Sequence, residues 1–81
     1  MPKFRVTWID WGDDDGSHAT RRASRSQVSS ILMGEIEARP NKKTGRAKWV
    51  VSGVADDGSR WVIPFNYEDG IATPITSIPV K

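Results

Sequence analysis

The sequence predicts an α+β fold of two layers, in which helices pack on one face of a twisted sheet. Two patterns lead to this prediction. Apolar residues alternate with polar ones over the first ten residues and again after residue 46, as they do in half-buried strands. Between these stretches the apolar residues follow the spacing of a helix face instead. We therefore expect one short N-terminal strand, two helices, and then a three-stranded antiparallel meander.

The 81 residues are expected to form a single domain, residues 1–81. The sequence has no cysteine, so we expect neither a disulfide framework nor a thiolate metal site. Nothing resembles a signal peptide, and no apolar run reaches the length of a membrane span. The expectation is a cytoplasmic protein with no cofactor, no metal and no membrane contact.

The first strand is expected over residues 4–9, with Trp8 among the residues of its buried face. An acidic turn follows over residues 10–16. Acidic residues at the start and arginines at the end favour a short helix over residues 17–23. Trp11, beside the acidic turn, is expected to be partly exposed.

A second helix is expected to begin at Ser24, because Gln27 three residues later completes a capping-box pattern. Gly34 is expected to weaken or end this helix. A polar loop over residues 39–45 follows. The apolar face of the helix is formed by Val28, Ile31, Leu32 and Ile36.

The second half of the chain has the period of strands. Strands are expected over residues 47–54, 61–67 and 71–80, with two Asp-Gly turns between them. Trp49 and Trp61 fall on the alternating face that we expect to be buried. Prolines in the last strand lack an amide donor and belong at strand ends or on an edge.

The charge of the chain is concentrated in one stretch. Residues 16–48 hold eight of the lysines and arginines against only Glu35 and Glu37, a local balance of +6, whereas the first 15 and the last 33 residues each sum to −2. His18, the only histidine, lies in this basic stretch. A focused positive field around a group that titrates near neutral pH suits RNA or phosphate chemistry.

His18 and Arg22 are four residues apart, so a helix would place them on one face, with Arg21 and Arg25 close by. A metal-independent ribonuclease needs a base for the 2′-hydroxyl, an acid for the leaving oxygen and cations for the phosphate. Imidazole and guanidinium groups supply these functions. The alternative is a surface histidine beside solvated arginines.

Two further cations are candidates for substrate binding. Lys48 and Arg60 each precede a tryptophan at the start of an expected strand, so a hairpin would place them on one sheet face. Arg46 belongs to a basic loop that could attract a polyanion. The alternative for all three is that they are solvent-facing residues of a half-buried sheet or a solvated loop. The acidic run over residues 13–15 lacks the spacing of a calcium loop, so no metal ligands are predicted.

The order of motifs resembles the small bacterial toxins of the BrnT kind, and it is also similar to related uncharacterised domains that bear a His-Ala-x-x-Arg helix, grouped with the RelE-like superfamily. The similarity rests on His18-Ala-Thr-Arg-Arg22, on the helix opened by Ser24, and on Gly45-Arg46 leading to a strand, an Asp-Asp-Gly turn and a strand. It implies a compact α+β endoribonuclease of a type II toxin–antitoxin pair. Such a toxin cleaves mRNA without a metal and is held inactive by a cognate antitoxin.

The resemblance gives roles to residues of this chain. It implies that His18 and Arg22 are catalytic and that Arg46, Lys48 and Arg60 add cations from the sheet, and we expect Arg21 and Arg25 to bind substrate beside them. BrnT-like chains usually end with an arginine-bearing strand, whereas this chain has no arginine beyond Arg60. That departure favours the alternative, a non-catalytic RNA- or protein-binding module of the same fold. A small structural protein is a third interpretation.

Overall fold

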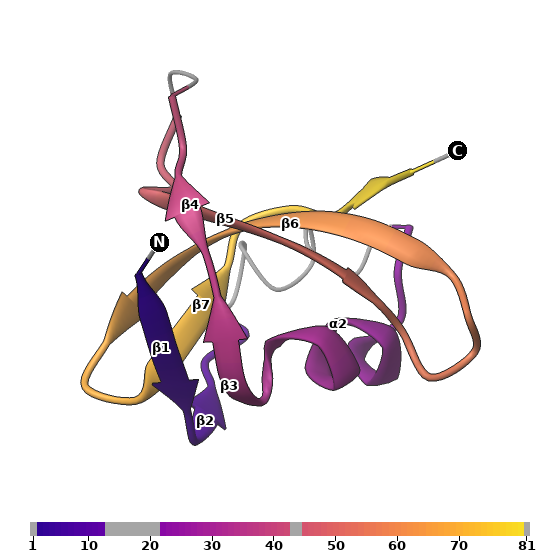
Figure 1. Cartoon of the computed structure of the whole chain (residues 1–81), viewed down its shortest axis with the longest axis horizontal. Coiled ribbons are helices and arrows are strands. Elements are labelled where there is room, and N and C mark those ends of the chain that lie inside the picture. The colour runs from indigo at the N-terminus through magenta and orange to yellow at the C-terminus, as the bar shows by residue number, and fades with distance from the viewer. Residues whose placement is uncertain (1, 13–21, 43–44, 81) are drawn as a thin grey trace.

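The structure is a computed structural model in which residues 2–12, 22–42 and 45–80 are described (Figure 1). Its strands bend around one side of a single described helix. The elements in chain order are β1 (Lys3–Val6), β2 (Trp8–Ile9), α2 (Arg25–Leu32), β3 (Gly34–Glu37), β4 (Arg39–Pro40), β5 (Trp49–Val54), β6 (Arg60–Glu68), β7 (Ile71–Pro74) and β8 (Ile78–Pro79).

The predicted fold class is wrong. The described residues are mainly β, with one helix, a six-stranded mixed sheet and a separate two-stranded sheet, in place of two helices and a three-stranded meander. The main reason lies at residues 34–40, expected as a helix end and a loop. Gly34 turns the chain with φ +88°, and buried Ile36 and Ala38 then alternate with exposed neighbours, which is the period of a strand. Most of the helix predicted over residues 17–23 lies outside the described residues.

The two sheets are joined by their strands into a ring. β1 pairs with β3, while the six-stranded sheet runs β2–β7–β6–β5–β4, with β8 also on β6. β1 continues into β2 after one residue, and β3 continues into β4 in the same way. Because β1 runs on into β2 and β3 runs on into β4, the order of neighbouring strands is closed: β1 with β3, β4 with β5, β5 with β6, β6 with β7, and β7 with β2. The ring has a face turned toward α2 and an outer face.

The helix packs on the inner face. Val28 and Leu32 are fully buried in a core that also contains Ile63 and Phe65 of β6. The predicted capping box at Ser24 is confirmed, because the Ser24 hydroxyl accepts from the Gln27 N–H at 3.1 Å and the Ser24 N–H donates to Gln27 Oε1 at 2.7 Å.

Aromatic rings fill the core near β1. Phe4 stacks on Tyr67 at 4.5 Å between centroids and meets Trp49 edge-on at 5.0 Å. The prediction that Trp61 lies in the core is confirmed, and Trp49 is half-buried against the core.

The two predicted Asp-Gly hairpins are confirmed. β5 pairs antiparallel with β6, and β6 with β7. At the second turn Asp69 and Gly70 have φ of +49° and +84°, the left-handed conformation that a tight two-residue hairpin requires. The third predicted strand, residues 71–80, is divided into β7 and β8, which pair with different ends of β6.

The first strand is bent at Thr7. The N–H groups of Thr7 and Trp8 both donate to the Gly70 carbonyl, at 2.8 and 3.2 Å, so two residues face one acceptor, as in a β-bulge. The bulge shifts the alternation by one residue, so that Val6 and Ile9 are buried. The expected burial of Trp8 is therefore wrong, because its side chain is 67% exposed.

No helix in the described part of the chain is long and apolar enough to cross a membrane.

Candidate functional site

The predicted catalytic pair cannot be assembled in full. His18 and Arg21 lie outside the described residues. Arg22 is exposed in the turn before α2, and Arg25 is the exposed first residue of that helix. The two described arginines thus lie at the N-terminal end of α2.

The predicted sheet cations share a face and lie far apart. In the register of β5 with β6, Arg60 lies opposite Val54 at one end of β5, and Lys48 directly precedes Trp49 at the other end. Six residues of strand separate Lys48 from Val54, which is about 20 Å. One phosphate group cannot contact both side chains.

Lys48 lies in a polar hollow of about 660 Å³ that is mainly acidic. Asp10, Glu68 and Asp69 line the same hollow. Three carboxylates beside one ammonium group repel a phosphate more than they attract it. This hollow is therefore a poor match to RNA.

Arg46 is exposed between β4 and β5. The Asn66 side chain fixes the backbone there, since its amide donates to the Arg46 carbonyl at 2.9 Å and its oxygen accepts from the Lys48 N–H at 2.8 Å. Asn66 thus holds the entry into β5 against β6.

A hollow of about 340 Å³ lies between β2 and the end of α2. We call it the aromatic hollow, because two indole rings form much of its wall. It is lined by Thr7, Trp8, Ile9, Trp11, Ser29 and Met33. Trp11 is half-buried, which confirms its predicted partial exposure. The bulge at Thr7 leaves Trp8 largely open to solvent.

Arg25 contacts one of the two tryptophans that line this hollow. Its guanidinium carbon lies 5.1 Å from the centre of the Trp11 ring, within the range of a cation–π contact. The contact brings together two residues that are 14 positions apart and that flank His18 in the sequence. An indole ring and a charged guanidinium are thereby held at one place.

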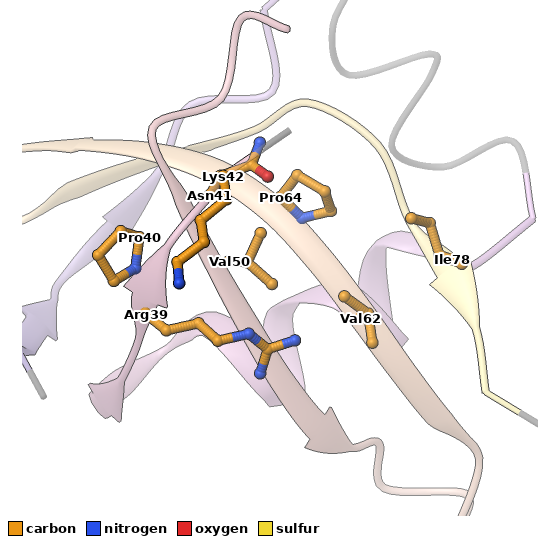
Figure 2. A pocket seen from close by; sticks show the side chains of 8 residues that line it. All are labelled: Arg39, Pro40, Asn41, Lys42, Val50, Val62, Pro64 and Ile78. Carbon is orange, nitrogen blue, oxygen red and sulfur yellow. The ribbon is translucent and has the colours of Figure 1, made fainter. Parts of the chain in front are cut away.

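A second concave surface of about 510 Å³ lies on the outer face of the six-stranded sheet (Figure 2). We call it the aliphatic groove, because its apolar lining holds no aromatic ring. It is lined by Arg39, Pro40, Asn41, Lys42, Val50, Val62, Pro64 and Ile78. The Arg39 side chain reaches from β4 across β5, where its Nη1 donates to Ser52 Oγ at 3.3 Å (Figure 2).

No group of three or more histidine, cysteine, aspartate or glutamate side chains that could hold a metal ion is present within residues 2–12, 22–42 and 45–80. Asp57 in the β5–β6 turn has its pKa lowered, chiefly by the Ser59 hydroxyl that donates to it, and also by the Ser59 N–H and the Gln27 amide. These bonds tie the turn to the start of α2, so their role is structural.

Sequence reasoning missed both surfaces as assembled units. Trp11 and Arg25 are not related by the spacing of a helix face or a strand face, so no such pattern predicts their contact. The aliphatic groove left a signal, because Val50 and Val62 occupy the alternating positions opposite to the buried tryptophans, where an exposed sheet face carries polar residues.

Comparisons of the chain with protein-family models, with curated proteins and with solved structures found no match.

Proposed function

We propose that this protein binds single-stranded RNA at the aromatic hollow. The observation that carries the proposal is the Arg25 guanidinium held over the Trp11 ring, 5.1 Å from its centre, beside the exposed Trp8. The resemblance to BrnT-like toxins extends the proposal to metal-independent cleavage of mRNA in the cytoplasm, under control of a cognate antitoxin.

Base stacking supports RNA as the ligand. A base has two apolar faces, and an exposed indole offers a flat surface of matching size. Trp8 is 67% exposed, and Trp11 forms another part of the wall of the same hollow. Stacking of this kind is sequence-tolerant and contributes about 1–3 kcal/mol per base.

The arginines at the N-terminal end of α2 supply the second half of the recognition, and the contact of Arg25 with Trp11 connects them to the hollow. Arg22 and Arg25 are both exposed, and guanidinium groups match phosphate oxygens in pairs of hydrogen bonds. A base stacked in the hollow and phosphates further along the same strand on the arginines would use different groups of one RNA strand. Neutralising phosphates also makes the binding sensitive to salt.

His18 would carry the chemistry. In the sequence it lies between Trp11 and Arg22, two residues that flank the aromatic hollow and the start of α2. In the proposed reaction the 2′-oxygen attacks phosphorus, the bond to the 5′-oxygen breaks, and a 2′,3′-cyclic phosphate and a 5′-hydroxyl form. His18 takes the proton from the 2′-hydroxyl or gives one to the leaving oxygen.

The test measures binding and cleavage separately. A labelled single-stranded RNA is titrated with the protein in EDTA while anisotropy is followed, and the products are then analysed for cyclic phosphate ends. The variants are Trp8→Ala, Arg25→Ala and His18→Ala. Arg60→Ala, which removes an exposed cation outside the hollow, is the matched control.

We expect Trp8→Ala and Arg25→Ala each to weaken binding by roughly tenfold, and Arg60→Ala to change it little. Loss of cyclic phosphate in His18→Ala with binding retained would support the ribonuclease. Binding without cleavage by the wild-type chain would favour the non-catalytic module. If Trp8→Ala and Arg25→Ala bind RNA as tightly as the control Arg60→Ala, the aromatic hollow is not the RNA site.

A further inference from the structure

We propose that the aliphatic groove binds an acidic, amphipathic segment of a partner protein. The segment would place a few aliphatic side chains on the outer faces of β5, β6 and β8, and its carboxylates beside Arg39 and Lys42. This surface is separate from the aromatic hollow, because the two share no lining residue.

The floor of the groove is apolar where a solvated sheet face would be polar. Two cross-strand pairs form it, Val50 with Pro64 and Val62 with Ile78. Ile78 is 43% exposed, and Val62 and Pro64 are partly exposed. A contiguous apolar surface of this kind on a half-buried sheet is typical of an interaction site.

The charged residues on the rim of the groove are both positive. Arg39 and Lys42 stand along one side of the groove, and Figure 2 shows both side chains extended beside Val50. None of the described residues that line the groove is acidic. The aliphatic stems of Arg39 and Lys42 extend the apolar surface, while the charged ends of these side chains remain available to a carboxylate.

Both short strands that flank the groove are closed to strand addition. The Asn41 N–H donates to the Lys48 carbonyl, so the backbone of Pro40 faces away from β5. The Val80 N–H donates to the Arg60 carbonyl, so the backbone of Pro79 faces away from β6. Proline has no N–H, and neither edge can donate to an added strand at these positions. These edges therefore disfavour strand addition and favour recognition of the partner by its side chains over the face.

The lining also distinguishes a protein partner from RNA. Valine, isoleucine and proline side chains offer no aromatic ring on which a base can stack, whereas they match leucine and valine side chains. The pattern of aliphatic floor and cationic rim is complementary to alternating acidic and aliphatic residues.

The probe is a fluorescein-labelled peptide in which aspartate or glutamate alternates with leucine or valine. A second peptide has asparagine and glutamine in place of the acids. Binding to the full chain is measured by anisotropy for two matched pairs of variants. Arg39→Glu is paired with Arg60→Glu, and Ile78→Ser with Val54→Ser. Val54 and Arg60 lie on the same outer face and outside the groove.

We expect Arg39→Glu and Ile78→Ser each to weaken binding of the acidic peptide by roughly tenfold, with little change in Arg60→Glu and Val54→Ser. The neutral peptide is expected to bind more weakly than the acidic one. RNA binding by Arg39→Glu should equal that of the wild-type chain, which separates this proposal from the preceding one.

Three outcomes would overturn the inference. The first is no binding of the acidic peptide at about 1 mM, or equal losses within each matched pair. The second is loss of RNA binding in Arg39→Glu, which would assign the groove to RNA. The third is a dimer of the chain that Ile78→Ser dissociates, which would assign it to a second copy.

Discussion

The aromatic hollow and the aliphatic groove are built from different parts of the same small fold. The hollow lies between a bulged strand and α2, and it combines indole rings with a guanidinium. The groove lies on the outer face of paired strands and combines aliphatic side chains with two cations. Both are positive and partly apolar, yet only the hollow offers rings for stacking. The comparison shows that the kind of apolar group, more than the charge, distinguishes the expected ligands.

The two surfaces also depend on different contacts. Ser29 and Met33, from α2 and its C-terminal end, form part of the wall of the hollow. The groove is lined by strands and by the residues that follow β4. A change that displaces α2 should therefore reduce RNA binding more than peptide binding. The following predictions test this difference, in order of decreasing effect.

Of the substitutions that affect α2, Gly53→Ala is expected to displace this helix most. A Cβ at this position of β5 would lie 2.7 Å from Ile31 Cγ2, closer than two carbon atoms can approach. We expect a loss of about 1–3 kcal/mol in the free energy of unfolding, measured by urea denaturation. RNA affinity should fall while peptide affinity is retained.

The control for Gly53→Ala is the same substitution in an Ile31→Ala background. Removing the obstructing side chain should abolish most of the additional cost. If Gly53→Ala costs as much in both backgrounds, the contact between β5 and α2 is not its cause.

Ser24→Ala should weaken the start of α2. It removes the hydroxyl that accepts from the Gln27 N–H, and loss of such a cap costs about 1 kcal/mol. Ser26→Ala, an exposed change in the first turn, is the matched control, with an expected effect within about 0.5 kcal/mol. Thermal unfolding of the two variants measures the difference, and equal melting temperatures would contradict the role of the cap.

Asp57→Asn should have the smallest effect and one that depends on pH. Hydrogen bonds from Ser59 and Gln27 favour the ionised carboxylate and lower its pKa below the ordinary 3.8. The ionised group therefore stabilises the fold above pH 3.8, and this contribution is lost as the pH falls through the lowered pKa. The melting temperature of the wild-type chain should exceed that of Asp57→Asn near pH 7, and the gap should narrow at about pH 2. A gap that stays constant over this range would contradict the assignment.

Local patterns in the sequence predicted the parts of the fold that depend on neighbours in the chain. The capping box at Ser24 and the Asp-Gly turns each require particular residues at fixed short spacings, and both are present in the structure. The helix face over residues 28–32 was predicted for the same reason. These features need no knowledge of what packs against them.

The parts that failed depend on residues far apart in the sequence. Residues 34–40 form β3 and β4 because β1 and β5 supply their hydrogen-bond partners. The prediction that Ile36 belongs to a helix face used only local spacing and did not take those distant partners into account. The burial of Trp8 was mispredicted because the bulge depends on the carbonyl of Gly70, more than sixty residues away.

The candidate sites follow the same division. Trp11 and Arg25 were each noted from the sequence, but their contact depends on where α2 begins relative to β2. Lys48 and Arg60 were assigned to one face correctly, while their separation follows from the register of the hairpin. The assignments of His18 and Arg21 remain predictions.

The parallel pairing of β2 with β7 has a consequence for biosynthesis. Trp8 lies opposite Ile71, so the Trp8 segment leaves the ribosome before its partner, which is made about sixty residues later. During translation β5 and β6 can form their hairpin while β2 is still unpaired. The ring closes only after residue 72 has emerged, and such distant pairing forms slowly because a long loop must be ordered first. Until then the Trp8 segment is exposed to chaperones and proteases of the cell.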